Sequence, residues 1–113
     1  SPLNPVDISG TASPIQYKGA FTQAMRDPNV HGIIGSICPT AVTDVDAVTD
    51  LVIRIHDTYR HLGKPFIMEC QGGNECQEAI LKLRDHGIPA YATAEQAVNA
   101  MVALYQYGKI NKG

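Results

Sequence analysis

Short apolar runs alternate along this chain with longer segments that have helical spacing. Mostly apolar runs cover residues 32–37 and 66–70, and a weaker one covers residues 88–92. Runs without polar alternation are typical of strands buried on both faces of a parallel sheet. Residues 3–9 alternate apolar and polar side chains, but Pro5 lacks a backbone donor. We therefore expect residues 3–9 at a sheet edge or in a loop.

The first helical segment begins at Ser13 and Pro14 and stops at Asp27-Pro28. Its apolar side chains share one face: Tyr17, Phe21, Ala24 and Met25. The second segment runs from about residue 44 to residue 62. Its apolar stripe consists of Val48, Leu51, Val52, Ile55 and Tyr59. We expect this stripe to face the sheet.

Local signals mark where the other helices begin and end. Thr43 with Asp46 resembles a shortened capping box for the second helix, and Gly63 is its expected left-handed stop. Asn74 is the expected cap of the third helix, and Thr93 caps the fourth in a box with Gln96. The inward-facing side chains of the third helix are Cys76, Ile80 and either Leu83 or Leu81. Those of the fourth are Ala97, Val98, Met101, Leu104 and Tyr105.

Strands that alternate with helices indicate right-handed βαβ crossovers and an α/β fold with a parallel sheet between helical layers. We expect three parallel strands and four helices in one domain, residues 1–108. Gly108 is the expected end of the last helix, which leaves residues 109–113 as a frayed tail.

Composition narrows the class of protein. The chain has 113 residues, of which 44% are hydrophobic and 18% charged, as expected for a small globular domain. A net charge of -2 without a basic run argues against a nucleic-acid surface. The apolar runs are too short to span a membrane, and the first residues do not resemble a signal peptide. The odd number of cysteines, without a framework spacing, leads us to expect a cytoplasmic protein.

Cysteines and histidines give no sign of a metal site or a catalytic residue. Three cysteines, Cys38, Cys70 and Cys76, lack a framework spacing, which favours reduced thiols and excludes the CxxC pattern of zinc sites. The histidines have no ligand spacing and are expected to be structural or at the surface: His31, His56, His61 and His86.

Two loops between a strand and a helix are the best candidates for a binding site. Residues 71–74, Gln-Gly-Gly-Asn, would let an anion such as a phosphate approach the backbone at a helix N-terminus. Residues 38–41, Cys-Pro-Thr-Ala, offer a hydroxyl group and a bend before the next helix. Each could equally be a plain turn. Because βα loops of consecutive units share the carboxyl edge of the sheet, we expect the two to lie side by side.

Several blocks, in order along nearly the whole chain, resemble the NDP-forming acyl-CoA synthetases. They are residues 4–10 (NPVDISG), 27–30 (DPNV), 38–44 (CPTAVTD), 63–65 (GKP), 72–73 (GG), 86–91 (HGIPAY) and 93–98 (TAEQAV). More distantly, residues 71–75 resemble a glycine-asparagine loop in the carboxy-terminal ligase domain of the succinyl-CoA synthetase β subunit. The resemblance implies a flavodoxin-like, three-layer αβα domain.

That family joins an acid to coenzyme A through an acyl phosphate and a phosphohistidine, at the expense of a nucleoside triphosphate. The resemblance places both loops at the acyl-phosphate and phosphohistidine pocket. Asn74 is added because it belongs to the candidate anion-binding loop, residues 71–74. The predicted binding residues are therefore Pro39, Thr40, Ala41, Gln71, Gly72, Gly73 and Asn74. The family's phosphorylated histidine belongs to another domain, so we predict no catalytic residue in this chain.

The resemblance also implies parts that this chain lacks. Coenzyme A, ATP or another nucleoside triphosphate and magnesium would bind to separate CoA-binding and ATP-grasp domains or subunits, so the chain alone should be inactive. The first βα unit would precede Ser1, leaving the edge of residues 32–37 bare and open to self-association or a partner. Alternatives are a regulatory domain of a related protein acetyltransferase, or a generic flavodoxin-like binding module.

Overall fold

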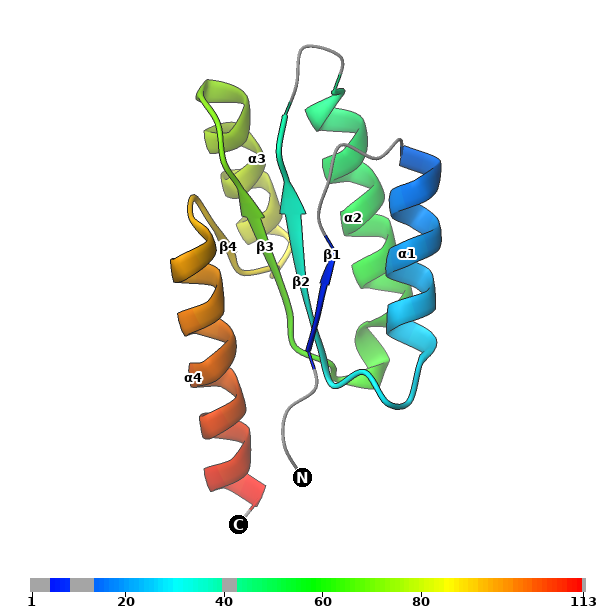
Figure 1. Cartoon of the computed structure of the whole chain (residues 1–113), viewed down its shortest axis with the longest axis vertical. Coiled ribbons are helices and arrows are strands. Elements are labelled where there is room, and N and C mark those ends of the chain that lie inside the picture. The colour runs from blue at the N-terminus through cyan, green and yellow to red at the C-terminus, as the bar shows by residue number, and fades with distance from the viewer. Residues whose placement is uncertain (1–4, 9–13, 40–42, 113) are drawn as a thin grey trace.

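A computed structural model describes residues 5–8, 14–39 and 43–112 of the chain (Figure 1). In order, its elements are β1 (Pro5–Ile8), α1 (Pro14–Arg26), β2 (Gly32–Ile37), α2 (Val45–Tyr59), the 3₁₀ turn η1 (Arg60–Leu62), β3 (Phe66–Cys70), α3 (Asn74–Asp85), β4 (Ala90–Tyr91) and α4 (Ala94–Lys112). Among these helices, none combines the length and the apolar content that crossing a bilayer requires.

The strands form one parallel sheet in the order β1-β2-β3-β4. The three predicted strands are confirmed, although the last is only Ala90–Tyr91 and lies at an edge. The sequence left open whether residues 3–9 form an edge strand or a loop. Residues 5–8 form a strand, β1, at the edge of the sheet opposite β4. Pro5 is tolerated there because it is the first residue of an edge strand.

The predicted bare edge of residues 32–37 is wrong. β1 pairs with β2 along residues 32–35, with Val6 opposite Ile33. The prediction missed this pairing because it treated residues 3–9 as an edge or loop and sought the neighbouring strand upstream of Ser1. In the described sheet the open edges are those of β1 and β4, so the expected self-association loses the argument that supported it.

Helices cover both faces of the sheet, giving the flavodoxin-like three-layer αβα arrangement (Figure 1). α1, α2 and α3 pack on one face, where their apolar side chains form the main core with Ile33, Ile37, Phe66 and Met68. α4 packs on the other face, where Ala97 and Met101 bury Ile67. Because both faces are covered, β2 and β3 are buried at all but one position, as their apolar sequences predict.

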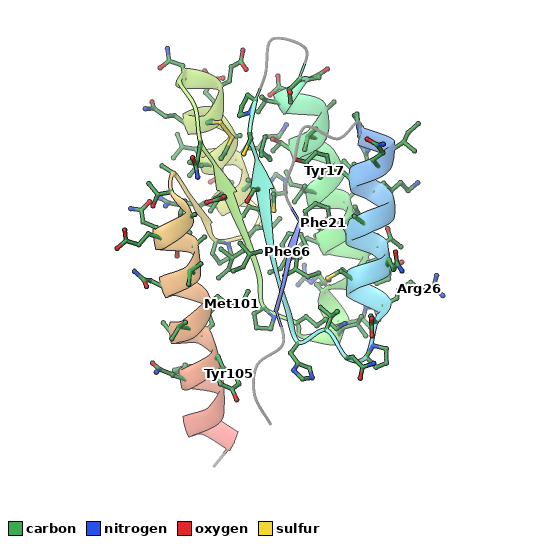
Figure 2. The ribbon with its side chains drawn as sticks, in the orientation of Figure 1. Tyr17, Phe21, Arg26, Phe66, Met101 and Tyr105 are labelled. Atoms are coloured by element: carbon green, nitrogen blue, oxygen red, sulfur yellow. A yellow bond between two sulfur atoms is a disulfide. The ribbon has the colours of Figure 1, made fainter. Side chains whose placement is uncertain are left out.

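Aromatic rings fill the space between α1 and the sheet. Phe21 lies between Tyr17 and Phe66, with ring centroids 5.9 Å and 5.5 Å away (Figure 2). All four side chains predicted for the buried face of α1 are buried. In α3 the buried leucine is Leu83, while Leu81 is exposed. In α4, Ala97 and Met101 are buried as predicted, but Val98 and Leu104 are exposed because only one side of this helix contacts the sheet.

Three helix ends in the structure differ from the ends predicted from the sequence. The side chain of Asp44, not that of Thr43, caps α2 by accepting a hydrogen bond from Ala47 N at 3.0 Å. A carboxylate there is favoured by the helix dipole. Asn74 is the first residue of α3 rather than its cap. α4 continues past Gly108 to Lys112, because one glycine costs a helix only about 1 kcal/mol.

Other predicted ends are confirmed. Gly63 adopts the left-handed conformation with φ of 70° after η1, which is the conformation expected of a glycine stop. Thr93 Oγ1 accepts a hydrogen bond from Gln96 N at 3.2 Å, so the capping position of α4 is the predicted one.

His56 gives the fold a dependence on pH. Its ring packs edge-on against Phe66, and its Nδ1 is buried without a hydrogen-bond partner among the described residues. Burial lowers the pKa of His56 below the usual 6.5, so below about pH 6.5 the unfolded chain takes up this proton more readily than the folded chain. Its contribution to stability is therefore complete above pH 6.5 and is lost as the pH falls toward the folded-state pKa.

We expect the free energy of unfolding of the His56→Phe variant to fall less between pH 7 and pH 5 than that of the wild type. Chemical denaturation at a series of pH values measures this, with His61→Gln as the control because His61 is exposed. The same pH dependence in His56→Phe and the wild type would contradict this role.

Candidate functional site

The carboxyl ends of β2 and β3 bring the two predicted loops together. Gln71 N donates a hydrogen bond to Ile37 O at 3.3 Å. A Cβ atom built on Gly72 would lie 3.5 Å from Pro39 Cγ, so the two loops are close neighbours at the sheet edge. The prediction that they lie side by side is confirmed for the described part. Thr40 and Ala41 lie outside the described residues.

The second loop leads into an open helix N-terminus. Gly73 is the N-cap of α3 and has no side chain to cap it, and its carbonyl accepts hydrogen bonds from the backbone of Cys76 and Gln77. The N–H groups of Asn74 and Glu75 have no hydrogen-bond partner within the described parts of the chain. Unsatisfied donors at the positive end of the helix dipole are suited to binding an anion.

The loop is accessible as well as polar. Gln71, Gly72, Gly73 and Asn74 are all exposed. A Cβ atom on Gly73 would meet no described residue within 4 Å, so on this side the described part of the chain leaves its backbone open to a ligand. The geometry therefore agrees with a binding loop, while the binding roles of the predicted residues remain predictions.

Negative charge limits where an anion could sit. A hollow of about 300 Å³ opens between the N-termini of α2 and α3. Its lining is mostly acidic and consists of Thr43, Asp44, Val45, Asp46, Glu75 and Glu78. Carboxylates repel an anion, so the favourable approach is over Gly73, away from this hollow. In the described parts of the chain, no group of acidic, histidine or cysteine side chains is arranged to hold a metal ion.

Asp50, on α2, is half-exposed. It forms an ion pair with Lys82 of α3 at 2.5 Å, which joins the two helices. The hydrogen bond from Lys82 lowers the pKa of Asp50. This pair supports the arrangement of the helices and does not belong to the site.

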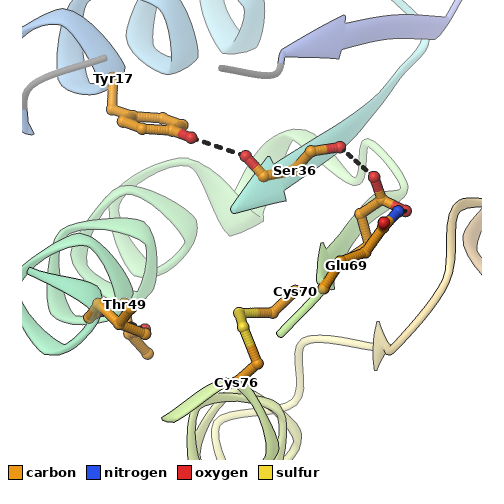
Figure 3. Close-up of a disulfide and its surroundings, with 8 residues drawn as sticks. Tyr17, Ser36, Thr49, Glu69, Cys70 and Cys76 are labelled. Carbon is orange, nitrogen blue, oxygen red and sulfur yellow. Dashed lines mark hydrogen bonds between the residues drawn. A yellow bond between two sulfur atoms is a disulfide. The ribbon is translucent and has the colours of Figure 1, made fainter. Parts of the chain in front are cut away.

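A buried polar network joins the carboxyl ends of β2 and β3 and was not predicted (Figure 3). Ser36 Oγ donates to Glu69 Oε1 at 2.5 Å, and both side chains are buried, with 3% and 5% exposed. Gln71 Nε2 lies 3.4 Å from Glu69 Oε2. The sequence signal was present, since Ser36 and Glu69 interrupt the two apolar runs with polar groups. Their pairing depends on the register that places them opposite each other.

Tyr17 extends this network to α1. Its hydroxyl donates to Ser36 O at 2.7 Å. Burial, and to a smaller degree the nearby Cys38 thiol group, raises the pKa of Tyr17, so the hydroxyl keeps the proton that it donates. The end of β2 is thereby held from both sides of the sheet.

The predicted state of the cysteines is wrong for two of the three. Cys70 and Cys76 form a disulfide, with Cα atoms 5.2 Å apart, while Cys38 is a free, exposed thiol. The prediction relied on cysteine count and spacing. Folding instead places the end of β3 and the first turn of α3 within the range that a disulfide spans.

Comparisons with known proteins agree with this architecture. Residues 1–112 match the Ligase-CoA domain family. The chain is 41% identical over 108 residues to the α subunit of acetate–CoA ligase [ADP-forming] I of Pyrococcus furiosus, covering 94% of this chain and 23% of that subunit. It is 31% identical over 108 residues to acetate–CoA ligase [ADP-forming] I of Archaeoglobus fulgidus, covering 96% of this chain and 14% of that protein.

One solved structure is similar to this chain in both fold and sequence. It is dinucleotide-forming acetyl-coenzyme A synthetase 1 of Candidatus Korarchaeum cryptofilum, in complex with phosphate and ADP. The match has a TM-score of 0.75 and 34% identity, over 88% of this chain and 21% of that chain. The chain thus spans less than a quarter of each of these relatives. Its sequence, from the first strand through the last helix, belongs to the Ligase-CoA domain family.

Proposed function

We propose that this chain is a domain or subunit of an NDP-forming acyl-CoA synthetase, and that its two loops contribute to the acyl-phosphate and phosphohistidine pocket. The observation that carries the proposal is that the ends of β2 and β3, joined by the hydrogen bond from Gln71 N to Ile37 O, bring Pro39 close to Gly72 at the open N-terminus of α3. Relatives named ADP-forming acetate–CoA ligases, and a dinucleotide-forming acetyl-coenzyme A synthetase solved with phosphate and ADP, support the same reaction class.

In this proposal the chain binds and orients a phosphoryl group and transfers no proton or phosphate itself. The N–H groups of Asn74 and Glu75 would donate to phosphoryl oxygens, and the dipole of α3 would offset their charge. Pro39, Thr40 and Ala41 would line the opposite side. Fixed donors in a site that excludes water stabilise charge more strongly than water does.

The remaining chemistry would come from other parts of the enzyme. Coenzyme A and ATP, or another nucleoside triphosphate, would bind to CoA-binding and ATP-grasp domains, in keeping with relatives that are at least four times longer than the matched region. Magnesium would accompany the nucleotide there. We place the assembled enzyme in the cytoplasm.

We expect the purified chain to form no thioester from acetate, coenzyme A and ATP, and its assembly with CoA-binding and ATP-grasp subunits to do so. In that assembly, Gly73→Ala should lower the rate by about 100-fold, because a Cβ on the open side of the loop displaces the phosphoryl group. Its fold should be unchanged, since that Cβ meets no protein atom among the described residues.

The matched control is Gly19→Ala, which adds a Cβ in open space on α1, in a different part of the chain. Thioester formation by the chain alone, or full activity of the Gly73→Ala assembly, would contradict the proposal. A regulatory domain of a protein acetyltransferase remains the second candidate. Lysine acetylation controlled by this chain, without thioester formation in any assembly, would favour it.

A further inference from the structure

The disulfide spans the loop that the proposed function assigns to phosphoryl binding. Cys70 is the last residue of β3, and Cys76 lies in the first turn of α3, so the bond joins the two sides of residues 71–75. Both cysteines are 1% exposed, whereas the residues between them are exposed. The disulfide is therefore buried beneath an exposed loop.

The disulfide has close neighbours in the loop after β3, which in turn lies beside the loop after β2. A Cβ on Gly72 would lie 3.0 Å from Cys76 Sγ, so Gly72 lies close beside the disulfide. The same Cβ would lie 3.5 Å from Pro39 Cγ in the loop after β2. On the strand side, Cys70 is paired in register with Ile37, whose carbonyl accepts the hydrogen bond from Gln71 N.

We propose that the Cys70–Cys76 disulfide is a redox-sensitive lock that holds residues 71–75 in the conformation that exposes the N–H groups of α3. Reduction by a small dithiol would break the S–S bond and transfer two electrons and two protons to the cysteines, while the dithiol closes to its own disulfide. The freed thiols no longer constrain the loop, which gains conformational freedom. What the loop binds rests on the proposed function, but the lock itself does not.

The test compares the oxidised and reduced chain by amide hydrogen exchange and by titration with inorganic phosphate followed by NMR. Thiol counting verifies each state, because oxidised chain exposes Cys38 alone on unfolding and reduced chain exposes all three cysteines. We expect about tenfold faster exchange after reduction at the amides of Gln71, Cys76 and Gln77, whose hydrogen bonds hold the two ends of the loop, with no change in the centre of β2. Phosphate affinity should fall in parallel.

Two variants separate this lock from a general effect of reductant. Cys76→Ser should exchange at the fast rate whether or not reductant is present. Cys38→Ser should respond to reductant as the wild type does, because Cys38 is outside the bond. Reduction of the wild type requires no substitution, so the test stands even if Cys76→Ser folds poorly.

The possible outcomes distinguish the disulfide lock from the proposed phosphoryl-binding role of the loop. Equal loop exchange in both redox states, or three free thiols in the air-oxidised chain, would overturn the lock. Faster exchange after reduction, with phosphate bound by neither state, would support the lock while contradicting the proposed binding role of the loop. Faster exchange with weaker phosphate binding would support both.

Discussion

Gly35→Ala is expected to lower the free energy of unfolding by about 3 kcal/mol, because the core has no room for a methyl group at this position. A Cβ on Gly35 would lie 2.5 Å from both Met68 Sδ and Phe21 Cζ. Contacts this short force neighbours to move. Met68 is flexible but fully buried, and the Phe21 ring is held between two other aromatic rings. Close-packed interiors absorb such a shift only at a cost in strain.

Urea denaturation of the variant and the wild type measures this effect. The matched control is Gly19→Ala, where the added methyl group meets nothing within 4 Å on an exposed helix position. That control should gain about 0.5–1 kcal/mol, since alanine favours the helix more than glycine does.

A double variant identifies the cause. Phe21→Leu removes the ring atoms that the new methyl group would meet, so the loss from Gly35→Ala should be smaller in a Phe21→Leu background. Equal losses in both backgrounds would mean that the ring contact is not what makes glycine necessary in β2.

Ser36→Ala is expected to lower the free energy of unfolding by about 2–3 kcal/mol, because it removes the hydroxyl donor from a buried carboxylate. Glu69 is 5% exposed and forms no ion pair in the described structure. Without Ser36, its remaining hydrogen-bond contact among the described residues is with Gln71 Nε2 at 3.4 Å, longer than a strong hydrogen bond. An under-satisfied buried charge costs more than the average hydrogen bond contributes.

A double-mutant cycle tests this explanation. Glu69→Met removes the charge and keeps a side chain of similar length, so Ser36→Ala/Glu69→Met should be at least about 1 kcal/mol more stable than Ser36→Ala alone. Glu78→Gln is the control, since Glu78 is exposed and should change stability by less than about 0.5 kcal/mol. Additive losses at positions 36 and 69 would show that the two side chains contribute independently.

Local patterns in the sequence determined the elements of this protein. The apolar runs predicted β2 and β3, since strands covered on both faces require apolar side chains at successive positions. Spacing on one face predicted the buried side chains of α1, and Thr93 predicted the start of α4. Because consecutive βαβ units have one hand, the same patterns also placed both candidate loops at one sheet edge.

Tertiary structure decided the contacts between residues that are distant in sequence or that compete locally. Ser36 and Glu69 are 33 residues apart, and only strand register pairs them. The pairing of β1 with β2 likewise depends on which edge of β2 is left free by β3. Whether Asp44 or Thr43 caps α2 depends on the residue at which the first turn of that helix begins. The disulfide forms because the end of β3 and the start of α3 bring two cysteines to 5.2 Å, a distance that cysteine count and spacing do not encode.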